Sequence, residues 1–251
     1  MRMTAQRYYS NIYWHFTGSP KGIDWREVRR PGDITKQGSV LDPVGAKDTL
    51  KLILTSKKLL GRCTERVIAD LETAKFCCVT DIPLKDLPSH APYYGKVAIG
   101  FKASAAHKSF LPVMYVPTES MPVVEMMVPN RKLTEMAYDF QRYQGSFQEQ
   151  QAMKLMSQAA HNKEVVRKPD AEAMKGFLMN FVKVTDFDPS PENTFYRERE
   201  WRNIGDFSFT ADDVAAVVVP ESLIGEIREH FNEEGYPSSI SIVAWEFIEQ
   251  A

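Results

Sequence analysis

Strand-like segments stand near both ends of this 251-residue chain, and a helix-patterned block separates them. Runs rich in aromatic and β-branched residues predict the strands, while apolar residues three to four positions apart predict the helices. Because strands and helices come in clusters and do not alternate regularly, an α+β fold is favoured over a doubly wound parallel sheet. We expect one domain over residues 1–251, with a mixed, largely antiparallel β core and a helical insertion at about 131–183.

Prolines and glycines punctuate the chain between the predicted elements. We expect a long loop at 17–33 and strands at 7–16, 74–83, 95–101, 111–116, 123–128, 194–209, 214–220 and 238–247. Helices are expected at 43–60, 132–143, 147–160, 170–182 and 221–235, with Gly61 ending the first and Gly235 ending the last.

Charge and apolar patterning exclude several classes of protein. The chain has 31 basic and 33 acidic residues, so no overall field draws it to nucleic acid or to an anionic membrane. The longest apolar run, Val214 to Val219, is far shorter than the roughly 18 residues of a membrane-spanning helix. The N-terminus has no apolar signal segment, and the three cysteines form an odd set. We therefore expect a cytoplasmic protein in which Cys63, Cys77 and Cys78 are small buried or half-buried hydrophobes.

Several familiar site motifs are absent from the sequence. No G-x-x-x-x-G-K-[ST] or G-x-G-x-x-G loop occurs, which argues against the commonest nucleotide-binding folds. No H-E-x-x-H or C-x-x-C spacing occurs among the five histidines and three cysteines, so we expect no metal site. The G-x-S-x-G elbow of serine hydrolases is also missing.

The stretch "WHFTGS" puts a histidine where an apolar strand breaks into a turn. His15 and Thr17 could each hold a ligand oxygen, the first through a ring nitrogen and the second through its hydroxyl. The alternative is a histidine that only hydrogen-bonds a loop carbonyl.

In "CVTDIPLKDLPSHAPYYGKVAIGF", a proline-rich segment presents His90, Tyr93 and Tyr94 before the next strand. Such rings can stack on a heteroaromatic ligand, or they can be ordinary packing residues.

The stretch "FYREREWR" carries two glutamates with one residue between them. On a strand, alternation would place Glu198 and Glu200 on one face and Arg197 and Arg199 on the other. Two neighbouring carboxylates raise at least one pKa, and they can hold a ribose hydroxyl or stabilise a nearby cation. The alternative is a solvated edge strand whose charges oppose aggregation.

Taken in this order, the three stretches resemble the AbiGi family of bacterial abortive-infection proteins, which are labelled phage-resistance proteins or antitoxins. The "TDIPL … H … YG … IGF" segment is the most specific part of the resemblance. The resemblance implies a phage-defence role and a possible toxin protein as partner.

A more remote similarity is to the ADP-ribosyltransferases, which implies an NAD ligand and an ADP-ribosyltransferase-like core. By this similarity, His15 matches the residue that ends the first core strand, and Tyr93 or Tyr94 matches the middle aromatic motif. Glu200 or Glu198 matches the late catalytic glutamate. The resemblance implies that His15, Thr17, His90 and the tyrosines hold NAD while a glutamate favours the cation formed on bond cleavage, as a transferase or an NAD glycohydrolase would require.

Two other functions stay open on the sequence. A non-catalytic protein could use the same fold to bind a toxin, with a face around Met153, Met156, Met174 and Met179. A nucleic-acid-binding regulator could use a patch formed by Arg26, Arg29, Arg30, Lys57, Lys58 and Arg62. The near-neutral total charge argues against the second.

Overall fold

The computed structural model describes residues 10–68, 71–118 and 177–250. The chain forms two compact units, one made of Met1–Val116 with Asn180–Ala251 and the other of Pro117–Met179. Nearly all of the second unit lies outside the described residues. The strand predicted at 123–128 and most of the predicted helical insertion therefore also lie outside them.

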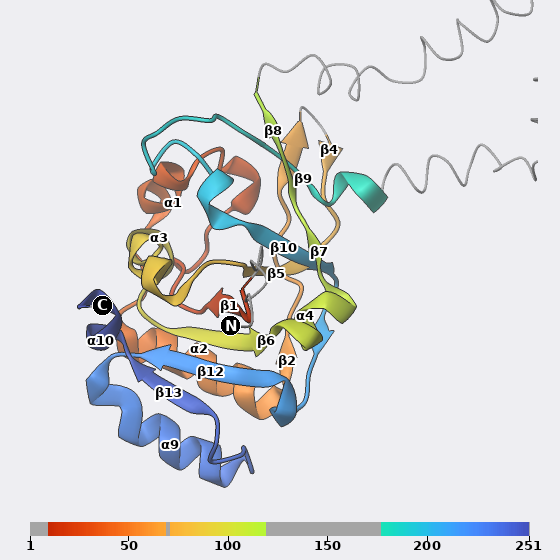
Figure 1. The fold of residues 1–251 in the computed structure, drawn as a ribbon. Helices are drawn as coiled ribbons and strands as arrows, with labels where there is room; N and C mark the ends of the chain where they lie inside the picture. The colour runs from red at the N-terminus through yellow and green to blue at the C-terminus, as the bar shows by residue number, and fades with distance from the viewer. Residues whose placement is uncertain (1–9, 69–70, 119–176, 251) are drawn as a thin grey trace, which may run out of the picture. The chain divides into compact units, whose positions relative to one another are not determined.

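A seven-stranded sheet organises the first unit, with the strand order β13-β12-β6-β1-β5-β10-β7 (Figure 1). Neighbouring strands are antiparallel except for the parallel pair β12 and β13. The strands are β1 (Ile12–Phe16), β5 (Phe76–Thr80), β6 (Ala98–Lys102), β7 (Leu111–Pro112), β10 (Glu200–Ile204), β12 (Val214–Val219) and β13 (Ser241–Ala244). The predicted α+β class with a mixed, largely antiparallel sheet is confirmed.

Within the described residues, three two-stranded sheets accompany the large sheet. They pair β11 (Phe207–Ser208) with β2 (Lys58–Leu59), β3 (Arg66–Ile68) with β4 (Leu71–Glu72), and β8 (Met114–Pro117) with β9 (Val182–Thr185). The α-helices are α1 (Pro31–Gln37), α2 (Pro43–Ser56), α3 (Ala91–Tyr94), α4 (Ala103–Ser109), α9 (Ile224–Glu233) and α10 (Trp245–Glu249). Short 3-10 helices are η1 (Trp25–Glu27), η2 (Leu84–Ser89), η3 (Tyr196–Glu198), η4 (Ala211–Asp213) and η5 (Glu221–Leu223).

Helix α2 illustrates how local sequence sets an element. The Asp42 side chain caps its start by accepting from the backbone N–H of Gly45 at 2.7 Å, and Pro43 occupies the first helical position. Leu50 and Leu54 lie on its buried face. The helix ends at Lys57, whose φ of 51° is left-handed, and not at Gly61 as predicted.

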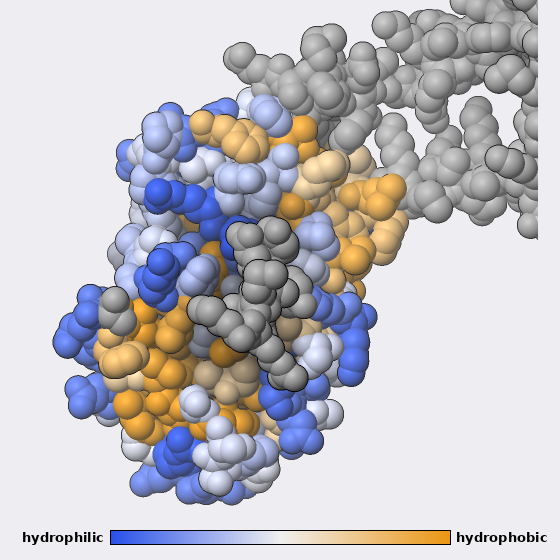
Figure 2. All heavy atoms as spheres, viewed as in Figure 1, coloured by the Kyte–Doolittle hydropathy of each residue, from blue (hydrophilic) through white to orange (hydrophobic). Residues whose placement is uncertain are grey.

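Apolar cores cover both faces of the large sheet. Tyr13 of β1 packs in the cluster that includes α2, while the next residue, Trp14, packs on the other face with Trp245 of α10. Helix α2 runs behind β6 and β12 in Figure 1. In Figure 2, apolar residues gather over β12 and α10, and hydrophilic residues surround them. Gly100 of β6 makes room for Trp14, because a Cβ there would lie 2.7 Å from the indole Cζ3 atom.

Several element bounds differ from the prediction. The loop expected at 17–33 contains η1 and the start of α1, and the strand expected at 111–116 is split into β7 and β8. The last predicted strand ends at Ala244, where α10 begins. β9 begins at Val182, next to the approximate end predicted for the helical insertion. In the described part of the chain, none of the helices has both the length and the apolar character needed to cross a membrane.

Candidate functional site

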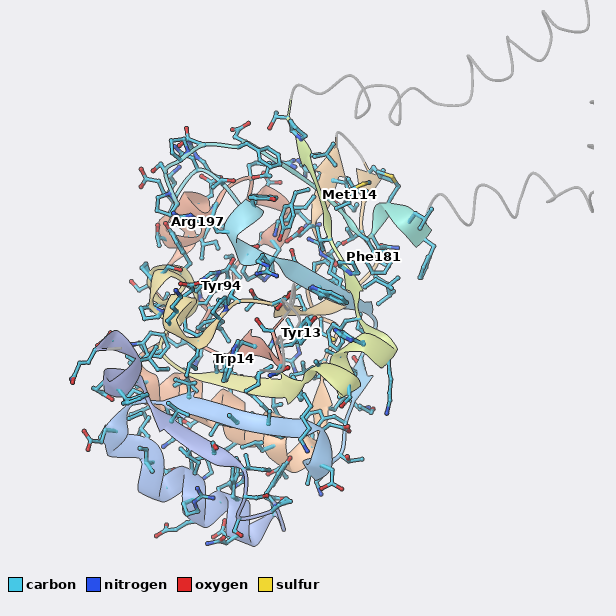
Figure 3. The ribbon with its side chains drawn as sticks, in the orientation of Figure 1. Tyr13, Trp14, Tyr94, Met114, Phe181 and Arg197 are labelled. Carbon is cyan, nitrogen blue, oxygen red and sulfur yellow. The ribbon has the colours of Figure 1, made fainter. Side chains whose placement is uncertain are left out.

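A cavity of about 110 Å³ lies in the first unit, at the ends of β1, β5 and β10. Its wall includes side chains from several segments that are far apart in the sequence. Among them are His15, His90, Tyr94, Lys183, Glu198 and Glu200. Figure 3 labels two residues of this wall, Trp14 on β1 and Tyr94 on α3. The cavity thus brings together the imidazole, the phenol and the carboxylates that the sequence singles out.

Close backbone contact holds the end of β1 against α3. The backbone N–H of Gly18 donates to the carbonyl of Tyr94 at 3.1 Å. A Cβ atom at Gly18 would lie only 2.7 Å from that carbonyl oxygen. Glycine at this position therefore allows His15 and Tyr94 to approach the same cavity.

His15 has a defined tautomer. Its Nδ1 lies 2.8 Å from the carbonyl oxygen of Cys78, which can only accept, so Nδ1 must carry the proton. Burial lowers the pKa of His15, and the hydrogen bond to Cys78 opposes this only in part. The ring is therefore neutral at neutral pH, and Nε2 is a hydrogen-bond acceptor at the cavity wall.

The two glutamates converge by a different route from the one predicted. Tyr196–Glu198 is a 3-10 helix, and Arg199 adopts a left-handed conformation with φ of 45° before β10 begins at Glu200. This turn, and not strand alternation, places Glu198 and Glu200 in one wall. Both are buried, at 8% and 5% exposure, so the solvated edge-strand interpretation is wrong.

Lys183 connects three carboxylates, those of the buried Glu198 and Glu200 and that of the half-buried Glu65. Its ammonium group lies 3.1 Å from Glu65, 3.1 Å from Glu198 and 3.0 Å from Glu200. Arg202, fully buried on β10, donates to Glu200 at 2.8 Å and also pairs with Glu65. Breaking such a network by removing one partner leaves an uncompensated buried charge.

The network separates the pKa values of the two glutamates. Burial would raise the pKa of Glu200, but Arg202 and Lys183 outweigh it and bring that pKa to about 2. Burial raises the pKa of Glu198 above its usual range, and the attraction of Lys183 does not fully offset this. The site therefore holds one carboxylate that is ionised at nearly any pH and one that takes up a proton more readily.

Aromatic rings also line the cavity. The Phe16 and His90 rings stack with centroids 5.9 Å apart, and the Trp25 and Tyr94 rings stack at 6.4 Å. The Tyr94 hydroxyl donates to Glu198. Burial and the charge of Glu198 raise the pKa of Tyr94 far above its usual value, so it is a neutral donor. This combination offers a flat apolar surface beside a carboxylate.

Two predicted site residues are not in this wall. The hydroxyl of Thr17 donates to the carbonyl of Ala46 at 2.8 Å, within the packing between β1 and α2. Tyr93 lines a smaller hollow of about 20 Å³ that shares His90, Tyr94 and Glu198 with the cavity. Of the two tyrosines offered by the sequence, the structure brings Tyr94 into the cavity.

The sequence analysis missed Glu65, Lys183 and Arg202. Arg202 follows Glu200 by two residues, and this spacing on a strand could have indicated a pair on one face. Lys183 lies within the apolar run "FVKVT", where a lysine needs a partner once it is buried. Glu65 carries no such signal in its surroundings.

Among the described residues, no group of three or more His, Cys, Asp or Glu side chains could hold a metal ion.

Three of the basic residues considered for nucleic-acid binding have acidic partners. Arg26 pairs with Asp24 at 2.8 Å, Arg30 with Asp33 at 3.6 Å and Lys58 with Asp206 at 3.7 Å. These pairs reduce the positive charge available to a nucleic acid.

Comparison with known proteins identifies the family. Among solved structures, Thermus sp. 2.9 DarT in complex with carba-NAD+ matches with 11% identity, over 94% of this chain and 97% of that chain. The TM-score of 0.39 makes this a loose likeness. Among curated proteins, no match was found. The model of the family described as "Putative abortive phage resistance protein AbiGi, antitoxin" matches residues 53–246, which is well over half of the chain. The chain therefore belongs to the AbiGi family.

Proposed function

We propose that this AbiGi protein has an ADP-ribosyltransferase-like fold and binds the nicotinamide–ribose end of NAD in the cavity. There it cleaves the bond between the nicotinamide and the ribose. One observation carries the proposal: His15, Tyr94 and Glu198 come from distant segments and line one cavity. NAD is also the ligand that the sequence resemblance implies. Three free cysteines agree with the reducing cytoplasm as its place of action.

Each group in the wall has a use in this proposal. The stacked rings of Trp25 and Tyr94 offer a surface for the nicotinamide ring. Nε2 of His15 accepts a hydrogen bond from a ribose hydroxyl. Glu198 is better placed than Glu200 to act on the sugar, because two cations, Arg202 and Lys183, neutralise Glu200, whereas Lys183 and the neutral Tyr94 hydroxyl contact Glu198.

The chemistry follows from the charges. The bond between C1′ of ribose and the ring nitrogen breaks, and its electron pair stays on nicotinamide, which leaves as a neutral molecule. The sugar becomes an oxocarbenium-like cation, which the Glu198 carboxylate stabilises through charge. Water, or a hydroxyl of an acceptor, then adds to C1′ and releases a proton. The products with water are nicotinamide and ADP-ribose.

Release of nicotinamide from NAD tests this function. We expect the wild-type protein to release it and Glu198→Gln to be at least about a hundredfold slower, because the amide keeps the shape but loses the charge. Glu229→Gln makes the same change on the exposed surface of α9 and should leave the rate unchanged. Full activity in Glu198→Gln would refute the assigned role, and no release by the wild type would refute the reaction.

A second function, binding of a toxin protein, is favoured by the family description as an antitoxin. The first unit exposes a candidate contact surface in which the Phe187 and Tyr196 rings lie 4.9 Å apart and are each about half exposed. Of the methionines considered for this role, Met153, Met156 and Met174 lie outside the described residues. Co-purification with the product of a neighbouring gene, lost in Phe187→Ser with Tyr196→Ser, would support this function.

A further inference from the structure

The buried network around the cavity has an unequal number of charges. Glu65, Glu198 and Glu200 supply three carboxylates, whereas Lys183 and Arg202 supply two cations. Lys183 lies against all three carboxylates, and Arg202 lies against two of them. With every group ionised, one negative charge therefore has no matching cation in the network.

The other titratable groups in the wall do not supply the missing positive charge. Burial lowers the pKa of both His15 and His90, which keeps the two imidazoles neutral. Burial raises the pKa of Cys63 to about 12, and it raises the pKa of Cys78 as well, so the thiols are also neutral. Tyr94 is a neutral donor to Glu198. The wall as a whole is therefore negative or holds an extra proton.

Aromatic rings line the same cavity as this negative charge. Phe16, Trp25, His90 and Tyr94 belong to the same wall as Glu65, Glu198 and Glu200. The faces of aromatic rings attract cations, and a nearby carboxylate adds to that attraction where water is excluded. A flat ring that carries a positive charge would meet both features at once.

On the basis of the proposed function, we propose that the cavity selects a cationic aromatic ring over a neutral ring of the same shape, and that Glu198 determines this selectivity. The ligand is then the oxidised, positively charged nicotinamide of NAD, and the neutral reduced ring is discriminated against. Glu198 is the determinant because its carboxylate lines the cavity and contacts only one of the two cations, Lys183.

A proton competes with the cationic ring for this site. Of the three carboxylates, Glu198 has a pKa raised by burial, whereas Glu200 is held ionised by Arg202 and Lys183. Protonation of Glu198 brings the network to neutrality without a ligand. Entry of a cationic ring therefore releases that proton, and the preference for the cation should weaken as the pH falls. The groups that face Glu198 are Tyr94, Lys183, Glu200 and Glu65.

The test compares two small probes of nearly equal shape, 1-methylnicotinamide, which is a cation, and nicotinamide, which is neutral. Calorimetric titration into the full-length protein should give at least tenfold tighter binding of the cation at pH 8. The ratio should fall to about one in Glu198→Gln and should be unchanged in Glu229→Gln. Glu65→Gln also removes one buried negative charge but keeps the contact between Tyr94 and Glu198, so it should lower the ratio as well.

The possible results separate this inference from the proposed function. Equal affinity for the two probes in the wild type, or an unchanged preference in a folded Glu198→Gln variant, would overturn the inference even if NAD binds. Preference for the cation without binding of NAD would support the inference and refute NAD as the ligand. Absence of binding by either probe and by NAD would overturn both. Equal thermal midpoints of Glu198→Gln and the wild type, within a few degrees, would show that the variant is folded.

Discussion

Tyr94 donates its phenolic O–H to the carboxylate of Glu198, although 104 residues separate the two in the sequence. The contact joins the aromatic wall of the cavity to its acidic wall. It exists because Gly18 lets β1 approach α3 and because the turn at Arg199 directs Glu198 inward. A ligand in the cavity would meet both side chains.

Tyr94→Phe should weaken NAD binding about tenfold while keeping the aromatic face. The Tyr94 hydroxyl helps to keep Glu198 ionised, so its loss makes Glu198 easier to protonate and weakens the attraction for the positively charged ring. A hydrogen bond to a charged group contributes about 1.5 kcal/mol, which corresponds to roughly tenfold in affinity. Tyr93→Phe is the matched control, because Tyr93 lines the smaller neighbouring hollow and is not among the residues that line the cavity. Calorimetry on both variants measures the difference. A larger loss in Tyr93→Phe than in Tyr94→Phe would reverse the assignment of the two tyrosines.

Glu200→Gln and Glu198→Gln should have unequal effects on stability. Removing the charge of Glu200 leaves Arg202 and Lys183 short of a partner, which should lower the free energy of unfolding by about 3–5 kcal/mol. Burial makes Glu198 easier to protonate, so replacing it by the neutral glutamine should lower the free energy of unfolding by less than about 1 kcal/mol. Urea unfolding at pH 7 measures both. Equal losses would mean that the two carboxylates share one environment.

The stabilising contribution of Glu200 should disappear in acid. Its pKa is about 2 in the folded protein and near 4.5 in the unfolded chain, so the contribution is complete above pH 4.5 and is lost as the pH falls toward 2. The contribution of Glu198 to stability changes with pH in the opposite direction. Because its pKa is raised in the folded protein, this contribution is complete below pH 4.5 and is lost as the pH rises. The stability difference between wild type and Glu200→Gln should therefore shrink between pH 6 and pH 3. A constant difference would exclude ionised Glu200 as its cause.

The cysteines should react slowly with a disulfide reagent at pH 8. Burial raises the pKa of Cys63 to about 12 and that of Cys77 to about 11, and little thiolate is present at pH 8. We expect rates at least about a hundredfold below those of the urea-unfolded chain. Rapid labelling of Cys63 in the folded protein would show that the cavity wall around it is open to solvent.

The sequence predicted the fold class and the main strands because these depend on local patterns. Short apolar or alternating runs formed β5, β6 and β12, and the proline after Asp42 began α2. The end of α2 was not predictable in the same way. Lys57 adopts a left-handed conformation at the helix end, where glycine is the usual residue.

The site was only partly predictable for a related reason. The sequence offered His15, Tyr94 and Glu198 as candidates, but their meeting depends on tertiary contacts between β1, α3 and η3. Lys183 has no local feature that names its three partners. The charge balance of the cavity, which decides what it can bind, therefore became visible only once the segments were assembled.

Calorimetric titration of NAD into the wild-type protein, repeated on His15→Ala and Glu198→Gln, tests the central claim most directly. We expect saturable binding to one site, weakened at least tenfold in each variant and unchanged in Glu229→Gln. Failure of the wild type to bind NAD, or wild-type affinity for NAD in folded His15→Ala and Glu198→Gln, would contradict the cavity as the NAD site.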